Sequence, residues 1–189
     1  MKSILELIVN KFTFYPHNKM IRTIKDLPSF VSERWLTTVD GENLQSLYFK
    51  HSQDKKDLII YFHGNTGNIF SHHRFEHAQR LFDMGLNVLL ISYRGYCKST
   101  GKPNEQGIYN DGEAALKYTN QTLGYSNQEI YIFGRSLGTT VATHISQNRK
   151  FKGIVLITPL TSAVEMGIEM GFRYFSIFAR GAFNSLKKI

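Results

Sequence analysis

The sequence predicts an α/β fold, with a mostly parallel sheet flanked by helices. Short apolar runs of strand length alternate with longer stretches whose apolar residues recur at helical spacing. The run Leu58–Phe62 is apolar throughout, which is typical of a strand covered on both faces. Because a helix separates each such strand from the next, the strands are expected to lie parallel and to be joined by right-handed crossovers.

A β-hairpin precedes the parallel strands. Trp35–Val39 and Leu44–Phe49 have strand character, and Asp40-Gly41 lies between them. This dipeptide favours the tight turn that joins two antiparallel strands. We therefore expect these two segments to pair with each other.

The remaining elements alternate along the chain. Asn104 can cap one of the helices, because its side chain can accept a hydrogen bond from a free backbone N–H of the first turn. The expected elements after the hairpin are strand 58–62, helix 71–84, strand 87–93, helix 104–122, strand 129–133, helix 137–147 and strand 153–158. One face of each helix is expected to be buried: Phe75, Ala78 and Leu81 in the first, Ile108, Ala115 and Thr119 in the second, and Leu137, Val141 and Ile145 in the third.

These elements divide the chain into three parts. Residues 1–34 form a lead-in segment, residues 35–160 the α/β core, and residues 161–189 a helical segment or lid. The last part is rich in large apolar side chains, which are typical of a helical core or lid and could line an apolar substrate pocket. These side chains are Met166, Met170, Phe172, Tyr174, Phe175, Phe178 and Phe183.

Composition bounds the function. The 189 residues are 42% hydrophobic and 20% charged, as in an ordinary globular protein. Lys and Arg number 23 against 15 Asp and Glu, a net charge of +8, but the bases are scattered, so nucleic-acid binding is not expected. A single cysteine, Cys97, fits a reducing compartment, and the cytoplasm is the expected location. The apolar residues of 4–9 could form a short amphipathic helix that docks on the domain or on a membrane surface.

The chemical centre is the pattern Gly134-Arg135-Ser136-Leu137-Gly138. It follows a predicted strand directly and opens a predicted helix, as a nucleophile elbow requires. The two glycines of this G-x-S-x-G motif permit a tight, strained turn that presents the serine at the carboxyl edge of the sheet. Ser136 is therefore the candidate nucleophile.

Acyl transfer also needs two N–H groups that bind the developing oxyanion. The backbone of Leu137, at the start of a helix, can supply one of them. The loop His63-Gly64-Asn65 after the strand 58–62 can supply the other, and we assign it to the backbone of Asn65. His63 is expected to brace this loop rather than to act as a base.

At these residues the sequence resembles the α/β-hydrolase family, and more closely its serine-aminopeptidase-like branch of α/β-hydrolase-domain proteins. The segments that carry the resemblance follow in the family's order and cover residues 14 to about 165. They are Phe14-Tyr15-Pro16, Thr38-Val39-Asp40-Gly41, Tyr61-Phe62-His63-Gly64-Asn65, Tyr93-Arg94-Gly95-Tyr96, Ser99-Thr100-Gly101-Lys102-Pro103 and the G-x-S-x-G motif. The resemblance implies a serine hydrolase that cleaves a carboxylic ester, thioester or amide, with a small or lipid-like acyl substrate and no cofactor. Cys97 departs from the pattern, because a glycine is usual there.

The rest of a catalytic triad is not found in the expected order. The family order is Ser, then Asp or Glu, then His. After Ser136 the only acids are Glu165 and Glu169, and His144 lies two helical turns beyond the serine. We expect a hydrolase truncated before its last strand–helix units and inactive or impaired as written. Strand 153–158 would then lie at an exposed sheet edge, open to self-association.

Two other functions stay open. His73, Glu76 and His77 match the H-x-x-E-H motif, in which two histidines bind zinc and the glutamate is the base, although no metal is expected at the site. A hydrolase-like domain without its base could also be a non-catalytic module that binds an acyl ligand or a partner.

Overall fold

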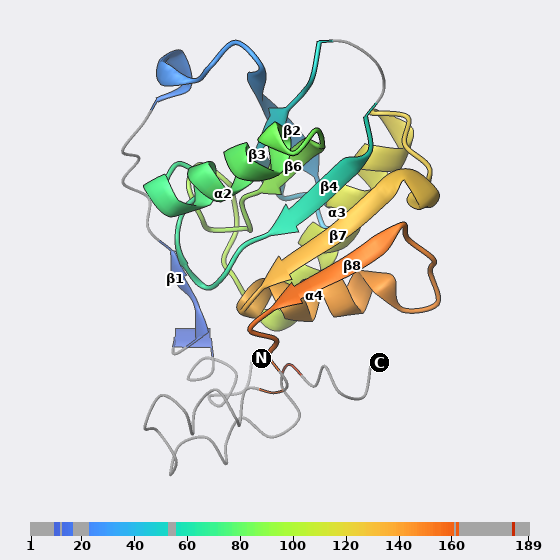
Figure 1. Ribbon diagram of the computed structural model, residues 1–189. Coiled ribbons are helices and arrows are strands. Elements are labelled where there is room, and N and C mark those ends of the chain that lie inside the picture. Colours follow the sequence, from blue (N-terminus) through green and yellow to red (C-terminus); the bar gives the residue numbers. More distant parts are fainter. Residues whose placement is uncertain are drawn as a thin grey trace.

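A computed structural model describes residues 10–11, 13–16, 23–52, 56–160, 162 and 183 of the chain. Its centre is a six-stranded sheet in the order β2-β3-β6-β4-β7-β8 (Figure 1). β3 pairs antiparallel with β2 and β6, whereas the pairs β6–β4, β4–β7 and β7–β8 are parallel. The predicted α/β fold with a mostly parallel sheet is confirmed.

The sheet and its helices have the following bounds. The strands are β2 (Val31–Thr37), β3 (Asn43–Phe49), β4 (Leu58–Phe62), β6 (Asn87–Ile91), β7 (Ile130–Arg135) and β8 (Gly153–Ile157). The helices are α2 (His72–Asp83), α3 (Glu105–Gln121) and α4 (Leu137–Ser146), and two single 3-10 turns are η1 (Ile24–Asp26) and η2 (Asn127–Glu129). Among the described residues, no helix has both the length and the apolar character needed to span a membrane.

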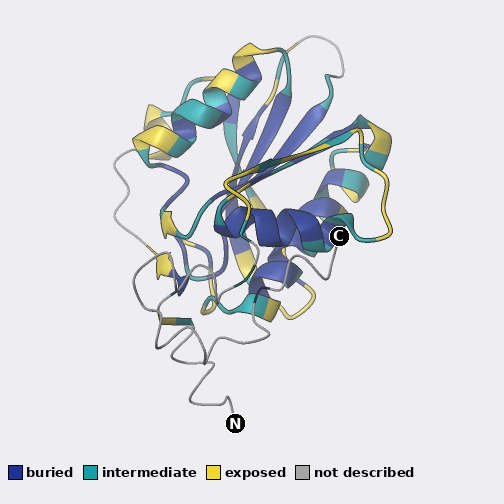
Figure 2. Ribbon diagram, turned by 60° about the horizontal axis from the view of Figure 1, so that its bottom comes forward, coloured by how far each residue is buried: buried dark blue, intermediate teal, exposed yellow. Residues whose placement is uncertain are grey.

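The helices cover the two faces of the sheet as two layers. Helix α2 packs on one face, against β3 and β6, and α3 and α4 pack together on the other face. Each face has its own cluster of buried apolar side chains, and α4 is buried along most of its length (Figure 2). The expected faces of α3 and α4 are buried; on α2, Phe82 is buried in place of the half-buried Leu81.

One expectation about the start of the chain needs correction. β2 begins at Val31 rather than at Trp35, because it pairs with β3 over its whole length, from Val31 opposite Phe49 to Thr37 opposite Asn43. The sheet therefore includes the last residues of the predicted lead-in segment. In addition, β1 (Tyr15–Pro16) pairs in parallel with β5 (Thr66–Gly67), so the lead-in segment is tied to the loop after β4.

A charge network, buried at Arg94 and Asp111 and exposed at Asp40, joins the hairpin turn to α3. The Arg94 guanidinium donates two hydrogen bonds to Asp40, at 2.7 and 3.0 Å, and one to Asp111, at 2.8 Å. The backbone N–H of Arg94 donates a further bond to Asp111, whose side chain is fully buried. The Arg94 side chain lowers the pKa of Asp40, whereas burial raises the pKa of Asp111 to about 6. One guanidinium thus holds two carboxylates and fixes the loop after β6.

Candidate active site

Ser136 occupies the sharp turn between β7 and α4. Its backbone has φ 50° and ψ −119°, a combination that non-glycine residues rarely adopt, and it costs on the order of 1–3 kcal/mol. Such strain persists only where the surroundings hold it. The Ser136 N–H donates to the Ile157 carbonyl of β8 at 2.9 Å, and the Ser136 carbonyl accepts bonds from the backbone and the hydroxyl of Thr139, at 2.8 and 2.6 Å.

The two glycines of the motif allow close backbone approaches around this turn. A Cβ on Gly138 would lie 2.0 Å from the Phe62 carbonyl oxygen, so β4 and the start of α4 are in direct contact. A Cβ on Gly134 would lie 2.6 Å from the Gly138 carbonyl oxygen. Both glycines are therefore required by the packing of β4, β7 and α4.

Strand pairing brings the loop after β4 beside Ser136. β4 and β7 are parallel neighbours, with Phe62 opposite Gly134, so the residues that follow these two positions emerge at the same edge of the sheet. A Cβ on Gly64 would lie 3.5 Å from the Cβ of Ser136. The structure thus brings together the two segments that the sequence analysis selected, 63–65 and 134–138.

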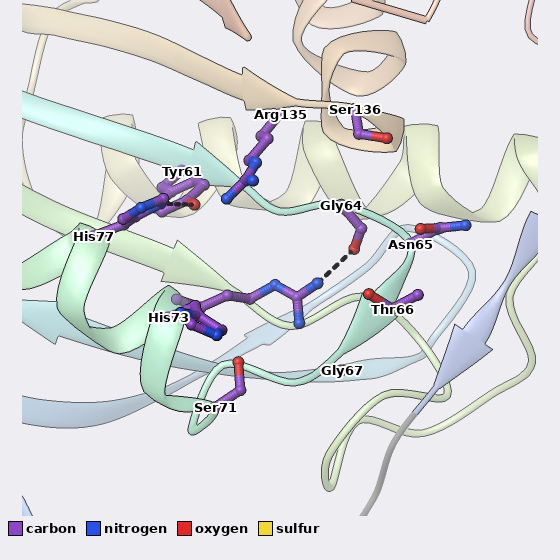
Figure 3. A pocket seen from close by; sticks show the side chains of 11 residues that line it. Tyr61, Gly64, Asn65, Thr66, Gly67, Ser71, His73, His77, Arg135 and Ser136 are labelled. Carbon is purple, nitrogen blue, oxygen red and sulfur yellow. Dashed lines mark hydrogen bonds between the residues drawn. The ribbon is translucent and has the colours of Figure 1, made fainter. Parts of the chain in front are cut away.

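The Gly64 carbonyl is held on the side of the loop away from the serine. His63 Nδ1 lies 2.6 Å from this oxygen, and because a carbonyl only accepts, Nδ1 carries the proton. Arg74 also donates to this carbonyl, at 3.2 Å, and Figure 3 shows the Gly64 oxygen directed away from Ser136. In a trans peptide the N–H points opposite to the carbonyl. The Asn65 N–H therefore points away from the His63 and Arg74 donors that hold the Gly64 carbonyl.

His63 braces this loop, as expected. Its side chain is fully buried, and its ring contacts the rings of Tyr93 and Tyr96, with centroids 4.5 and 5.5 Å away. Burial, with the nearby charge of Arg74, lowers the pKa of His63 well below its usual value, so the ring is neutral at pH 7. Tyr93 and Tyr96 in turn donate hydrogen bonds to the carbonyls of His63 and Asn65, at 2.8 and 2.6 Å.

A cavity of about 570 Å³ opens beside Ser136 (Figure 3). The residues that line it include Ser136, Asn65, Arg74, Arg135, His73 and His77. They come from the turn after β7, the loop after β4 and helix α2. The Ser136 side chain is half-buried and faces this cavity rather than the core.

The other candidate residues lie elsewhere. His144 is in the last turn of α4 with its ring stacked on Tyr109 of α3, so it is not near Ser136. Glu165 and Glu169 lie outside the described residues, as does the apolar stretch 161–183 apart from Ser162 and Phe183. Phe183 is fully buried against Phe14, and it does not line the cavity.

The zinc motif does not assemble a metal centre among the described residues. His73 and His77 both line the cavity, but Glu76 bonds His72, at 2.9 Å. No group of three His, Cys, Asp or Glu side chains that could hold a metal ion occurs in the described part of the chain. The arrangement therefore does not support the zinc hydrolase alternative.

Some residues of the site carried no signal in the sequence. Arg74 occupies an unspecified position of the H-x-x-E-H pattern on α2, so the sequence assigns it no role. Its contact with Gly64 depends on how α2 packs beside the loop. Cys97, by contrast, was marked by its departure from the family pattern. Cys97 adopts φ 52°, in the left-handed region that favours glycine. A cysteine at this position therefore strains the backbone of the loop after β6.

Comparison with known proteins defines the family. The sequence profile of the alpha/beta hydrolase fold matches residues 57–181, most of the chain. The chain belongs to this family. The match includes both the loop after β4 and the turn that carries Ser136.

Curated relatives place the chain in the α/β-hydrolase-domain branch. It is 34% identical over 158 residues to the alpha/beta hydrolase domain-containing protein WAV2 of Arabidopsis thaliana, covering 81% of this chain and 50% of the relative. It is 31% identical over 140 residues to the lysophosphatidylserine lipase ABHD12 of Danio rerio, covering 69% and 36%. The chain thus spans half or less of the length of these relatives.

Solved structures share the fold. An alpha-beta hydrolase from Vibrio vulnificus aligns with a TM-score of 0.82 at 18% identity, covering 100% of this chain and 72% of that one. An esterase of Pyrococcus furiosus aligns with a TM-score of 0.68 at 26% identity, covering 93% and 68%.

Proposed function

We propose that this chain is the nucleophile-bearing part of a serine hydrolase, which cleaves a carboxylic ester, thioester or amide through an acyl-enzyme on Ser136. The observation that carries the proposal is the backbone of Ser136, held at φ 50° in the turn from β7 to α4. The strained backbone of this half-buried serine destabilises the folded chain. Backbone strain of this kind is characteristic of functional positions.

The oxyanion would be bound by the backbone N–H groups of Asn65 and Leu137. Leu137 is the first residue of α4, where a backbone N–H has no acceptor within the helix. The Asn65 N–H is oriented by the contacts of the Gly64 carbonyl with His63 and Arg74. Two such donors, fixed before the reaction, stabilise the charge that develops in the transition state.

The reaction forms a bond between the Ser136 Oγ and the substrate carbonyl carbon. The electron pair of the carbonyl moves to its oxygen, and a general base takes the serine proton. When the tetrahedral intermediate collapses, the bond to the alcohol, thiol or amine breaks and the leaving group receives that proton. Water then attacks the acyl-enzyme by the same route and releases the acid.

The base comes from outside the described residues. Among those residues, no histidine side chain has a hydrogen bond to the Ser136 hydroxyl; His63 is buried against Tyr93, and His144 stacks on Tyr109. We propose that the missing Asp and His belong to a segment other than the described core.

An ester with an acyl chain is the proposed substrate class. Two similar proteins are named a lysophosphatidylserine lipase and an esterase, and both names describe ester cleavage. The cavity beside Ser136, of about 570 Å³, is large enough for a small-molecule ligand.

Labelling with a fluorophosphonate, which reacts with an activated serine, tests the nucleophile. Added imidazole can replace a histidine base that the described residues do not place at Ser136, so the experiment is run with and without it. We expect Ser136 of the wild type to be labelled, faster with imidazole, and the S136A variant to remain unlabelled. Peptide mass spectrometry identifies the modified residue.

Ser71 provides the matched control, because it lines the same cavity. The S71A variant should be labelled as fast as the wild type. Absence of labelling in the wild type even with imidazole would contradict the proposal and favour a non-catalytic binding domain. Equal labelling of wild type and S136A would also contradict it.

A further inference from the structure

The cavity beside Ser136 is lined by positive charge. Arg74 and Arg135 both line it. No described aspartate or glutamate belongs to its lining. An anionic group bound in this cavity, beside the proposed nucleophile, could therefore neutralise the charge of the two arginines.

Arg74 is a cation fixed in the wall of this cavity. Its guanidinium donates to the carbonyls of Gly64 and Asn68, at 3.2 and 3.5 Å, and no described carboxylate pairs with it. A Cβ on Gly67 would lie 2.4 Å from the Arg74 Nη1, so the loop that follows β4 is closed over the side chain. Burial lowers the pKa of Arg74, but an arginine stays protonated in proteins. The charge thus remains in place without a carboxylate beside it.

Arg135 reaches the same space from the opposite wall. It is the last residue of β7 and directly precedes Ser136, and Figure 3 shows its side chain extending toward the space beside Tyr61 and His77. In the described part of the chain, Arg135 also has no ion-pair partner. Its side chain is exposed, so it can move onto a ligand at small cost.

The positive charge of the two arginines affects the pKa values of Tyr61 and His77. The charges of Arg74 and Arg135 oppose the rise in the pKa of Tyr61 that burial causes. Burial and then the charge of Arg135 lower the pKa of His77. Of the two acids on α2, Glu76 bonds His72, and neither Glu76 nor Asp83 lines the cavity.

We propose that this cavity binds an oxyanion group of the substrate, a carboxylate or a phosphate, between Arg74 and Arg135 while the ester carbonyl lies at Ser136. A guanidinium offers parallel N–H donors that match the oxygens of either group. The inference deepens the proposed function, because it assumes that Ser136 is the nucleophile. It narrows the substrate to esters that carry a negative charge close to the scissile bond.

Calorimetric titration of the S136A variant tests the binding without turnover. The ligands are hexanoyl esters of glycerol 3-phosphate, of glyceric acid and of glycerol, which share an acyl chain and differ in charge. We expect both anionic esters, or one of them, to bind about tenfold more tightly than the neutral ester. The additional substitution R135Q should remove this difference and leave the binding of the neutral ester unchanged.

Arg80 gives the matched control, because it is exposed on α2 and does not line the cavity. R80Q removes the same charge and should not change the preference. Equal binding of the charged and neutral esters, or equal effects of R80Q and R135Q, would overturn the inference. Inorganic phosphate that binds as tightly as the phosphate ester would assign the cavity to a free anion and overturn the substrate assignment.

The labelling experiment separates the two proposals. If the anionic esters bind through Arg135 but Ser136 does not react with the fluorophosphonate, the nucleophile assignment fails and an anion-binding site remains. If Ser136 reacts and the charged esters show no preference, the subsite alone is wrong.

Discussion

Gly138 lies where the turn after β7 comes closest to the backbone of β4. A methyl group there would lie 2.0 Å from the carbonyl oxygen of Phe62 and 2.9 Å from that of His63. Both atoms belong to the backbone, so no side-chain rotation relieves the overlap. We expect G138A to lower the free energy of unfolding by about 3 kcal/mol, as measured by urea unfolding.

A second glycine separates crowding from backbone strain. Gly124 has φ +75°, but a Cβ there would meet nothing within 4 Å. G124A should cost only about 1 kcal/mol, the strain of a left-handed alanine. If G138A cost no more than G124A, the turn that holds Ser136 would be looser than described.

Asp111 gives the molecule a dependence on pH. Burial raises its pKa from 3.8 to about 6, so at intermediate pH the folded chain holds a proton that the unfolded chain has lost. The contribution of this group to stability therefore falls as pH rises from about 4 to about 6. Relative to D111N, which cannot titrate at this position, the wild type should lose about 3 kcal/mol over that range.

The measurement is urea unfolding of both proteins at several pH values. The comparison concerns the slope with pH, because D111N also removes contacts of Arg94 and so changes the stability at every pH. Asp40, whose pKa Arg94 lowers, contributes the opposite slope in both proteins. Parallel curves would show that Asp111 is ionised in the folded state down to its ordinary pKa.

At the level of elements, the start of α3 depends on one side chain. The Asn104 carboxamide oxygen accepts a hydrogen bond from the Gly107 N–H at 2.9 Å, as the sequence predicts. N104A should lower the free energy of unfolding by about 1 kcal/mol. Ser71 occupies the equivalent position of α2 but makes no such bond, so S71A should cost less than half as much. Equal losses would mean that the cap does not stabilise α3.

The sequence predicts the long elements well because their periodicity is local. The buried faces of α3 and α4 follow the spacing of Ile108, Ala115, Val141 and Ile145, and each helix begins within a residue of its expected start. The pairing of β1 with β5 could not be predicted in this way. A strand of two residues has no periodicity, and this pairing joins segments that are far apart in the chain.

The order of strands is a property of the whole molecule, and it determines the site. β6 pairs with one edge of β4 and β7 pairs with the other edge, so β4 lies between β6 and β7. The direction of winding changes at β4, and the carboxyl ends of β4 and β7 become neighbours there, as at the ligand sites of open α/β sheets. The motifs identify the loop after β4 and the turn after β7 separately. Arg74 and Arg135 line the same cavity because of this topology. No local sequence pattern therefore predicts that cavity.

The outer edge of β8 leads to the last prediction. β8 ends the sheet, as expected for strand 153–158, and Ile154, Val155 and Ile157 are 47%, 39% and 41% exposed. An apolar strand that ends a sheet offers unpaired backbone groups to another chain. We expect the protein to associate with rising concentration in sedimentation velocity experiments, and V155K, which places a charge on this strand, to weaken the association at least about tenfold. V39K makes the same change in the hairpin turn, where Val39 is 90% exposed, and should leave the association unchanged. A wild type that stays monomeric at all concentrations, or that responds equally to both variants, would show that β8 does not mediate pairing.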